Sequence, residues 1–187
     1  MRIISGRYKG KKILQPSDKV TRPLKDLTKE SIFNIINHSN LFKIDLENSN
    51  ILDLFSGVGS FGLECLSRGA SNVVFYENYG SALNVLKKNI SNLGCSEKIK
   101  IIDSDIFNRK SFAILNKKFQ IIFIDPPFKE KKIFNILETI IELNLLKKKG
   151  IFIIHRHKKE KDNFPNNFNI LLEKSYGISK IIFGTCS

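Results

Sequence analysis

The chain has 187 residues, of which 42% are hydrophobic and 26% are charged. This balance is typical of one globular domain with a sizeable core and argues against a disordered chain. No apolar run approaches the roughly 18–20 residues of a membrane span, and the N-terminus lacks the apolar segment of a secretory signal. We therefore expect a cytoplasmic protein without a membrane partner. The cysteines are few and widely spaced, which argues against a disulfide framework and against a metal site; they are Cys65, Cys95 and Cys186.

The chain is strongly basic, with a formal net charge of +13. Most of the excess lies in two blocks, residues 1–30 and residues 129–161, and the remainder of the chain is nearly neutral. An AT-rich genome would also raise the lysine content, but it would spread lysine along the whole chain. Two separate basic blocks indicate a binding face for a polyanion.

The first 40 residues are expected to form a small extension. Two short apolar runs within residues 1–20 predict a hairpin with Gly6 and Gly10 as turn residues. Apolar residues at helical spacing predict an amphipathic helix over about 25–38. A polar stretch, 39–49, then reads as a connector.

From residue 50 onward, short apolar runs alternate with helical stretches. Such continuous runs are typical of parallel strands that are covered on both faces, and the alternation predicts a doubly wound, mostly parallel α/β sheet. Tyr176 and Gly177 split the tail into two strands of a closing antiparallel hairpin. We therefore predict a Rossmann-like domain over residues 41–187. Its expected strands are 50–55, 72–77, 98–103, 119–125 and 150–155, with one helix that ends near residue 68 and further helices at 80–93 and near 133–141.

The first motif is a glycine-rich turn between a strand and a helix. Gly57, Gly59 and Gly62 form G-x-G-x-x-G, in which glycine lets the backbone approach a ligand and the third glycine permits close helix packing. Glu77 closes the next strand, where a carboxylate can accept both hydroxyl protons of a ribose. Together these features predict a site for a nucleoside-type cofactor.

The acids near this turn favour a cationic nucleoside. Asp53 stands directly before the glycines, and a carboxylate suits an amine-bearing ligand better than a diphosphate. S-adenosylmethionine carries a sulfonium and an ammonium group and has no phosphate. Asp105 could bind the adenine amine, with Asp103 as a rival; Asp105 could instead cap a helix.

The second motif is Asp125-Pro126-Pro127-Phe128 at the carboxyl end of the fourth predicted strand. Ligands of open α/β sheets bind at carboxyl strand ends where the strand order reverses, so strands one and four should be neighbours. An exocyclic amine of a base is a poor nucleophile, and hydrogen bonds from its N–H groups to Asp125 and to the Pro126 carbonyl would activate it. The prolines fix φ, and Phe128 offers a face on which an unstacked base can rest. Asp125 could also accept the proton that the methylated nitrogen releases.

At this point the sequence resembles a known family. DLFSGVG followed by DPPF resembles the class I S-adenosylmethionine-dependent amino-methyltransferases. MRIISGRYKGKKI, TRPLKDLTKESIFNII, NILDLFSGVGSFGLECLSRGA and YGISKIIF resemble the RsmD family, in the same order and over nearly the whole chain. That family methylates a guanine N2 of small-subunit (16S) ribosomal RNA in bacteria.

The resemblance implies S-adenosylmethionine as cofactor and small-subunit ribosomal RNA as partner, either naked or in an assembling particle, for an enzyme expected to be a monomer. It also implies that the extension of residues 1–40 contacts RNA. The implied cofactor residues are Asp53, Phe55, Ser56, Gly57, Gly59, Glu77, Asp105 and Ile106. The implied catalytic residues are Asp125, Pro126, Pro127 and Phe128, and Arg22, Phe128 and Lys129 would contact the RNA.

The sequence departs from the resemblance in places. Leu24 and Leu27 stand where the family more often has polar or basic residues. His155-Arg156-His157 stands where the family often carries an acid, and no third metal ligand lies nearby. We predict that this stretch forms a basic, RNA-facing loop with the lysines that follow it.

Three other functions remain open. An adenine-N6 DNA methyltransferase could use the same Asp-Pro-Pro-Phe turn, although no separate base-reading domain is apparent. A non-enzymatic RNA-binding Rossmann domain would explain the charge and leave that turn idle. A nicotinamide-dependent dehydrogenase would explain the glycines and Glu77 but neither the charge nor the proline pair.

Overall fold

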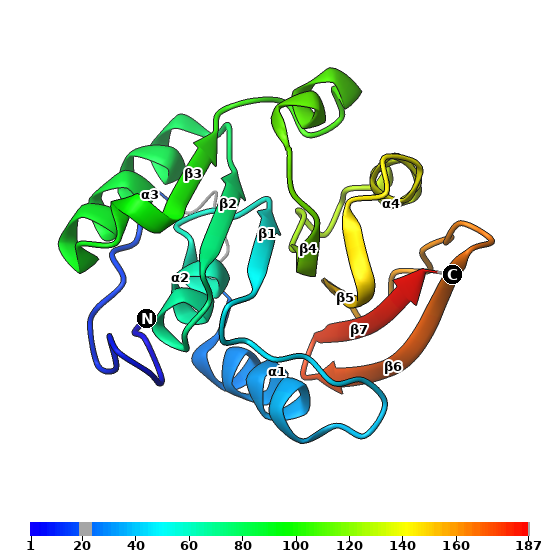
Figure 1. Cartoon of the computed structure of the whole chain (residues 1–187), viewed down its shortest axis with the longest axis horizontal. Helices are drawn as coiled ribbons and strands as arrows, with labels where there is room; N and C mark the ends of the chain where they lie inside the picture. The colour runs from blue at the N-terminus through cyan, green and yellow to red at the C-terminus, as the bar shows by residue number, and fades with distance from the viewer. Residues whose placement is uncertain (19–23, 187) are drawn as a thin grey trace.

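The computed structural model describes residues 1–18 and 24–186. Its centre is a seven-stranded sheet in the order β3-β2-β1-β4-β5-β7-β6 (Figure 1). The first five strands run parallel, and β7 lies antiparallel between β5 and β6. The predicted doubly wound sheet with a closing antiparallel hairpin is therefore confirmed. The strands are β1 (Asn50–Leu54), β2 (Asn72–Tyr76), β3 (Ile99–Ile102), β4 (Phe119–Ile124), β5 (Leu146–His157), β6 (Phe168–Tyr176) and β7 (Ser179–Cys186).

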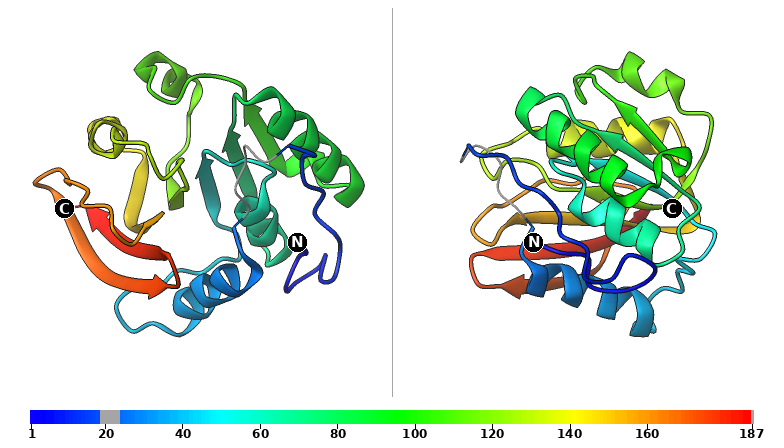
Figure 2. Two further views of the ribbon diagram at one scale, coloured as in Figure 1. Left: turned by 180° about the vertical axis from the view of Figure 1, so that it is seen from behind. Right: turned by 90° about the vertical axis from the view of Figure 1, so that its left-hand side faces the viewer.

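Helices cover both faces of the sheet (Figures 1 and 2). Side chains of β4 alternate between two cores: Ile121 and Phe123 face the core that α1, α2 and α3 complete, whereas Ile122 and Ile124 face α4 and η2. The helices are α1 (Asp26–His38), α2 (Ser60–Ser67), α3 (Gly80–Leu93) and α4 (Ile133–Glu142), with short 3-10 helices η1 (Ser96–Lys98) and η2 (Arg109–Ile114). The 3-10 helices were not predicted from the sequence.

The strand order reverses between β1 and β4. Leu54 pairs with Ile124 at the carboxyl ends of these strands, and the Asp125 amide donates to the Leu54 carbonyl at 3.3 Å. Strands one and four are thus neighbours, as expected from the sequence. Their pairing brings the glycine-rich turn and the Asp-Pro-Pro-Phe turn to the same side of the sheet.

The turn after β1 needs unusual backbone angles. Phe55 has φ 56°, and Gly57 and Gly59 also lie in the left-handed region. Gly62 acts differently, because a Cβ there would lie 2.4 Å from the ring of Phe75 on β2. The third glycine therefore permits α2 to lie directly on the sheet, as the motif indicated.

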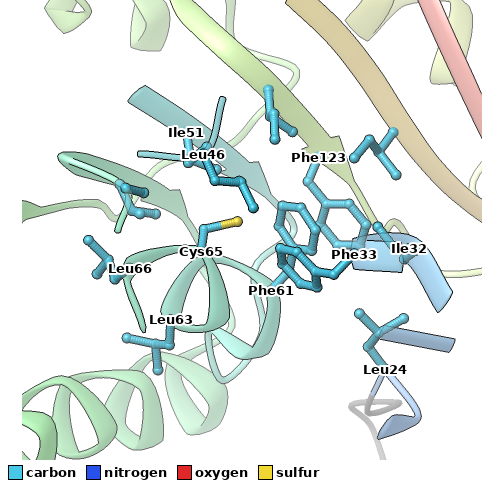
Figure 3. Packing of buried hydrophobic residues seen from close by; sticks show 14 of the residues in the cluster. Leu24, Ile32, Phe33, Leu46, Ile51, Phe61, Leu63, Cys65, Leu66 and Phe123 are labelled. Atoms are coloured by element: carbon cyan, nitrogen blue, oxygen red, sulfur yellow. The ribbon is translucent and has the colours of Figure 1, made fainter. Parts of the chain in front are cut away.

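A stack of phenylalanine rings joins α1 to the sheet through α2 (Figure 3). The rings of Phe33 and Phe61 lie 5.3 Å apart, and those of Phe61 and Phe123 lie 4.0 Å apart with nearly parallel planes. All three side chains are buried. The N-terminal helix is thus part of the same core as the sheet.

The N-terminal segment only partly forms the expected hairpin. It contains a single antiparallel bridge, Arg2 to Lys12, instead of two regular strands. The physical reason is that the amides of Ile4 and Ser5 donate to the carboxylate of Glu64 on α2, at 2.8 and 3.0 Å, and so cannot join a strand ladder. Before these two residues, Ile3 still donates to the Lys11 carbonyl, so the hairpin is formed only at its open end.

Glu64 is also the centre of a buried charge cluster. Its carboxylate accepts from Arg68 Nε at 2.8 Å and lies 3.5 Å from Lys29 Nζ. Lys29 has no exposed surface and donates to the Arg2 carbonyl at 2.8 Å. Burial lowers the pKa of Lys29, while the charge of Glu64 opposes that change. The cluster fastens the N-terminal segment and α1 to α2.

Strand β5 extends beyond its predicted bounds at both ends. It begins at Leu146 and continues through His157, so it includes the lysines before Gly150, and its pairing to β4 is irregular between Phe119 and Ile121. Its end pairs with β7 through His155 and Arg156, so these residues belong to the sheet.

Replacing Glu64 with Gln should destabilise the fold by about 3–5 kcal/mol, because it removes the buried carboxylate that lies closest to the Lys29 charge and leaves only the half-exposed Asp26 at 3.8 Å. Urea unfolding measures the change. The matched control is Glu142→Gln, which removes an exposed pair with Arg109 and should cost at most about 1 kcal/mol. Equal losses in the two variants would contradict a structural role for the buried cluster.

Candidate functional site

A cavity of about 480 Å³ opens where the strand order reverses. Its volume lies within the roughly 300–1,000 Å³ typical of sites for small ligands. The turn after β1, the end of β2 and the turn after β4 supply most of its wall. Among the residues singled out from the sequence, the cavity is lined by Asp53, Phe55, Ser56, Gly57, Glu77, Asp125, Pro126, Pro127 and Phe128.

Asp53 places a buried carboxylate at this cavity. The residue is 1% exposed, and its Oδ2 accepts the Gly62 amide at 2.9 Å. Within the part of the chain that the structure describes, Oδ1 has no hydrogen-bond partner. Burial raises the pKa of Asp53 well above its usual value, and the charges of Asp125 and Glu77 raise it further. A cationic group in the cavity would offset these costs, so the site fits a ligand such as S-adenosylmethionine.

Glu77 stands at the end of β2 and supports the glycine-rich turn. Its Oε2 accepts the Gly57 amide at 2.6 Å, and its Oε1 accepts the Tyr79 amide at 2.8 Å. A carboxylate oxygen has a second acceptor position. Glu77 can therefore hold the turn and still accept hydrogen bonds from the hydroxyls of a ribose.

A smaller cavity of about 90 Å³ shares Phe55 and Glu77 with the main one. Asp105 and Ile106 line it, whereas Asp103 lines neither cavity. Asp105 does not cap a helix. Its Oδ1 accepts the Phe107 amide at 3.0 Å in a local turn, and η2 begins later, after Asn108. Of the two candidate acids, Asp105 is the one that lies at the site.

The turn after β4 carries a half-buried aromatic ring. Phe128 meets the rings of His155 and His157 edge-on, with centroids 5.9 and 5.0 Å apart. The Asp125 side chain is 13% exposed and lies in the same cavity wall. The aromatic ring and the carboxylate thus meet at one end of the cavity.

His155 is a site residue that the sequence interpretation missed. Its Nδ1 lies 2.8 Å from Asp125 Oδ1, and the residue is 4% exposed. The prediction of a solvent-facing loop at His155 and Arg156 is wrong, because β5 continues through both residues and pairs with β7. The alternation of side chains along the strand was the available signal, because His155 shares a face with the buried Ile151 and Ile153.

Arg156 is completely buried next to the turn. Its guanidinium contacts both carboxylate oxygens of Asp162, at 2.7 to 3.0 Å. It also donates to the carbonyl of Glu130 at 2.7 Å and more weakly to that of Pro127 at 3.4 Å. A charged side chain thus holds the Asp-Pro-Pro-Phe turn from the protein interior.

Three predicted site residues lie elsewhere or cannot be placed. Gly59 is outside the cavity wall, where a Cβ would meet Leu86 at 2.5 Å, so its conformation serves packing. Lys129 is exposed and does not line the cavity. Arg22 lies outside the described residues.

Several lining residues were not singled out from the sequence as cavity residues, including Met1, Gln15 and Leu24 of the N-terminal segment. No sequence signal marks them, because only the tertiary fold brings this segment to the cavity. In the described part of the chain, no group of three potential metal ligands comes together. No helix there combines the length and apolar character needed to cross a membrane.

The sheet and its cavity define the fold class as that of a Rossmann-like class I methyltransferase. Solved structures share this fold. One from Haemophilus influenzae is 30% identical and has a TM-score of 0.76, covering 98% of this chain and 97% of that chain. The rRNA methyltransferase AviRa from Streptomyces viridochromogenes has a TM-score of 0.69 at 12% identity, covering 89% of this chain and 87% of that chain, which shows a common fold alone.

The chain belongs to the family described as "Conserved hypothetical protein 95", whose family model matches residues 1–185. Two curated relatives carry the name "Ribosomal RNA small subunit methyltransferase D". The one from Haemophilus influenzae is 33% identical and covers 95% of this chain and 90% of the relative. The one from Escherichia coli K12 is 28% identical, and the match covers 95% of this chain and 85% of that relative. The family resemblance inferred from the sequence is thus confirmed, and the chain is a methyltransferase.

Replacing Asp53 with Asn should stabilise the folded protein at neutral pH. The folded-state pKa of Asp53 lies above its unfolded value, so Asp53 loses stabilising free energy as the pH rises from about 4 through the raised pKa. Asn keeps an acceptor for the Gly62 amide and does not titrate. Urea unfolding at several pH values should therefore show a flatter dependence in the variant; an unchanged profile would contradict the raised pKa.

Proposed function

We propose that this protein transfers a methyl group from S-adenosylmethionine to the exocyclic N2 amine of a guanine in small-subunit ribosomal RNA. One observation carries the proposal: the glycine-rich turn and the Asp-Pro-Pro-Phe turn line the same cavity. The names of the curated relatives support the RNA substrate. The choice of a base amine rests on the chemistry of the second turn, and the choice of guanine N2 rests on the family resemblance.

The residues of the first turn are proposed to bind the cofactor. The Asp53 carboxylate would favour its positive charge, and Glu77 would accept hydrogen bonds from its ribose. Asp105 would accept a hydrogen bond from the adenine amine at the smaller cavity. When bound, S-adenosylmethionine supplies a methyl carbon that is electrophilic because it is attached to a sulfonium.

The residues of the second turn are proposed to hold and activate the acceptor base. Asp125 and the Pro126 carbonyl would accept the N–H groups of the amine, which localises the nitrogen lone pair. Phe128 would support the face of the unstacked base. His155 engages Oδ1 of Asp125, which orients the carboxylate within the cavity.

The transfer itself would be a direct displacement. The amine nitrogen forms a bond to the methyl carbon while the carbon–sulfur bond breaks and its electron pair stays on sulfur. The nitrogen then releases one proton, which Asp125 can accept. Most of the rate enhancement would come from holding the two reacting groups in line.

The direct test uses S-adenosylmethionine with a labelled methyl group and offers immature small subunits, naked small-subunit RNA, or DNA. We expect label in N2-methylguanosine after digestion to nucleosides. Label in N6-methyladenine of DNA instead would establish the rival adenine methyltransferase. Cofactor binding without transfer to any of the three substrates would contradict the proposed reaction.

Replacing Asp125 with Ala should lower kcat by roughly 10²–10⁴, the range for loss of a positioned proton acceptor. Because Asp125 is assigned to the acceptor base, the affinity for S-adenosylmethionine should change little. Single-turnover assays and calorimetry measure the two quantities. A variant that keeps its kcat would remove Asp125 from the mechanism.

Replacing His155 with Ala should lower kcat by roughly tenfold, because Asp125 loses the hydrogen bond that orients it. His155→Asn should restore most of the activity, since an Asn amide can donate from nearly the same position as Nδ1. The matched control is His38→Asn at the exposed end of α1, which should behave as wild type. Equal kcat values for His155→Ala and His155→Asn would contradict the positioning role.

A further inference from the structure

Two exposed loops leave the sheet beside the cavity. Residues 129–132 follow the turn after β4, and residues 158–161 follow β5. Because β4 and β5 are parallel, with Ile124 paired to Ile154, both loops lie at the carboxyl ends of the strands. They hold six exposed lysines, which we call the carboxyl-side lysines: Lys129, Lys131, Lys132, Lys158, Lys159 and Lys161.

The buried Arg156 ties these loops together. It is fixed to Asp162 directly after the second loop by contacts to both carboxylate oxygens. It also donates to the carbonyls of Pro127 and Glu130, before and within the first loop. The two loops therefore form one pre-organised surface.

Most of the positive charge on this surface faces solvent. Lys131 pairs with Glu160, and this hydrogen bond lowers the pKa of Glu160. Asp162 is already paired with Arg156. As far as the structure describes the chain, the other five carboxyl-side lysines form no ion pair. The surface thus keeps an excess of positive charge that an anion can use.

Phe128 lies at the junction of the two loops. Lys129 follows Phe128 in the chain. The Phe128 ring contacts the ring of His157, which directly precedes Lys158. A base resting on Phe128 would therefore have cationic side chains on both sides of it. The phosphates that flank such a base lie within a few ångströms of it along an RNA strand.

We propose that the carboxyl-side lysines bind the phosphates on either side of the target nucleotide. This inference rests on the proposed function and adds to it the surface on which the RNA docks. Lysine contacts phosphate as a point charge, and phosphate contacts fix the register of a nucleic acid without reading its sequence. The surface would therefore deliver and hold the RNA strand, and the cavity would select the base.

Two other basic groups lie away from the cavity. Lys147, Lys148 and Lys149, the amino-side lysines, stand at the start of β5, roughly 30 Å from Lys158 at about 3.3 Å per residue. The turn that carries Arg7 is attached to Ser67 at the far end of α2. The amino-side lysines thus provide a control of equal charge at the opposite ends of the strands.

The experiment compares two triple variants of the full chain: one changes Lys158, Lys159 and Lys161 to Gln, and the other changes the three amino-side lysines to Gln. Binding of transcribed small-subunit RNA is measured at several salt concentrations without methyl transfer. The carboxyl-side variant should bind roughly tenfold or more weakly at low salt, with a salt slope smaller by about 2. The amino-side variant should stay within about twofold of wild type. Both should bind S-adenosylmethionine normally, which also verifies folding.

Equal losses in the two triple variants would overturn the proposal, as would a larger loss on replacing Arg7 and Lys9. These outcomes are independent of the proposed function. If wild type methylates guanine N2 and the two triple variants bind RNA equally well, the proposed docking surface is contradicted and the proposed reaction stands. If wild type binds RNA through the carboxyl-side lysines but methylates no guanine, the proposed reaction is contradicted and the docking surface stands.

Discussion

The arrangement of the site depends on the pairing of β1 with β4. The chain passes through three crossovers between these strands, and the hydrogen bonding of β1 to β4 brings back together two turns about 70 residues apart. One turn starts after Leu54 and the other after Ile124, and the Asp125 amide is bonded to the Leu54 carbonyl. A shift of one residue in this register would turn the side chains to the wrong faces of the sheet. The continuous burial of both strands makes such a shift costly.

Two buried cations hold the parts of the molecule that the sheet does not fix. Lys29 attaches the N-terminal segment to α2 through Glu64, and Arg156 attaches the turn after β4 to the end of β5. In both places a buried charge is satisfied by a carboxylate and by backbone carbonyls. Because each cluster is shielded from water, the loss of one partner would leave a buried charge uncompensated, which is strongly destabilising. Both clusters therefore define single geometries for irregular segments beside the cavity.

The sequence predicted most of the fold because its signals are local. Apolar runs, glycine spacing and the Tyr176-Gly177 turn each describe a few adjacent residues, and all three gave the observed elements. The positions of Glu77 and Asp125 at one cavity followed from a general rule on strand ends. Their roles in binding and catalysis remain predictions.

What the sequence did not predict arises from contacts between distant residues. Nothing near Ile4 indicates that its amide bonds to Glu64, and a hairpin was the natural local interpretation. The contact between His155 and Asp125 depends on how far β5 extends, and its end is set by pairing with β7. Histidine and arginine at a strand end suggested exposure to solvent, whereas their tertiary partners make their burial favourable.

The antiparallel hairpin has a consequence for the edges of the sheet. Without it, the open edge would be β5, whose central residues are fully buried and apolar. Such an edge is a template for pairing with another copy of the chain. The hairpin moves the edge outward to β6, which carries exposed charges at Glu173 and Lys174 and an irregularity in its register. Charges and an irregular register on an edge strand disfavour its pairing with another sheet, so the last two strands have a consequence for the sheet edge that is separate from any part in catalysis.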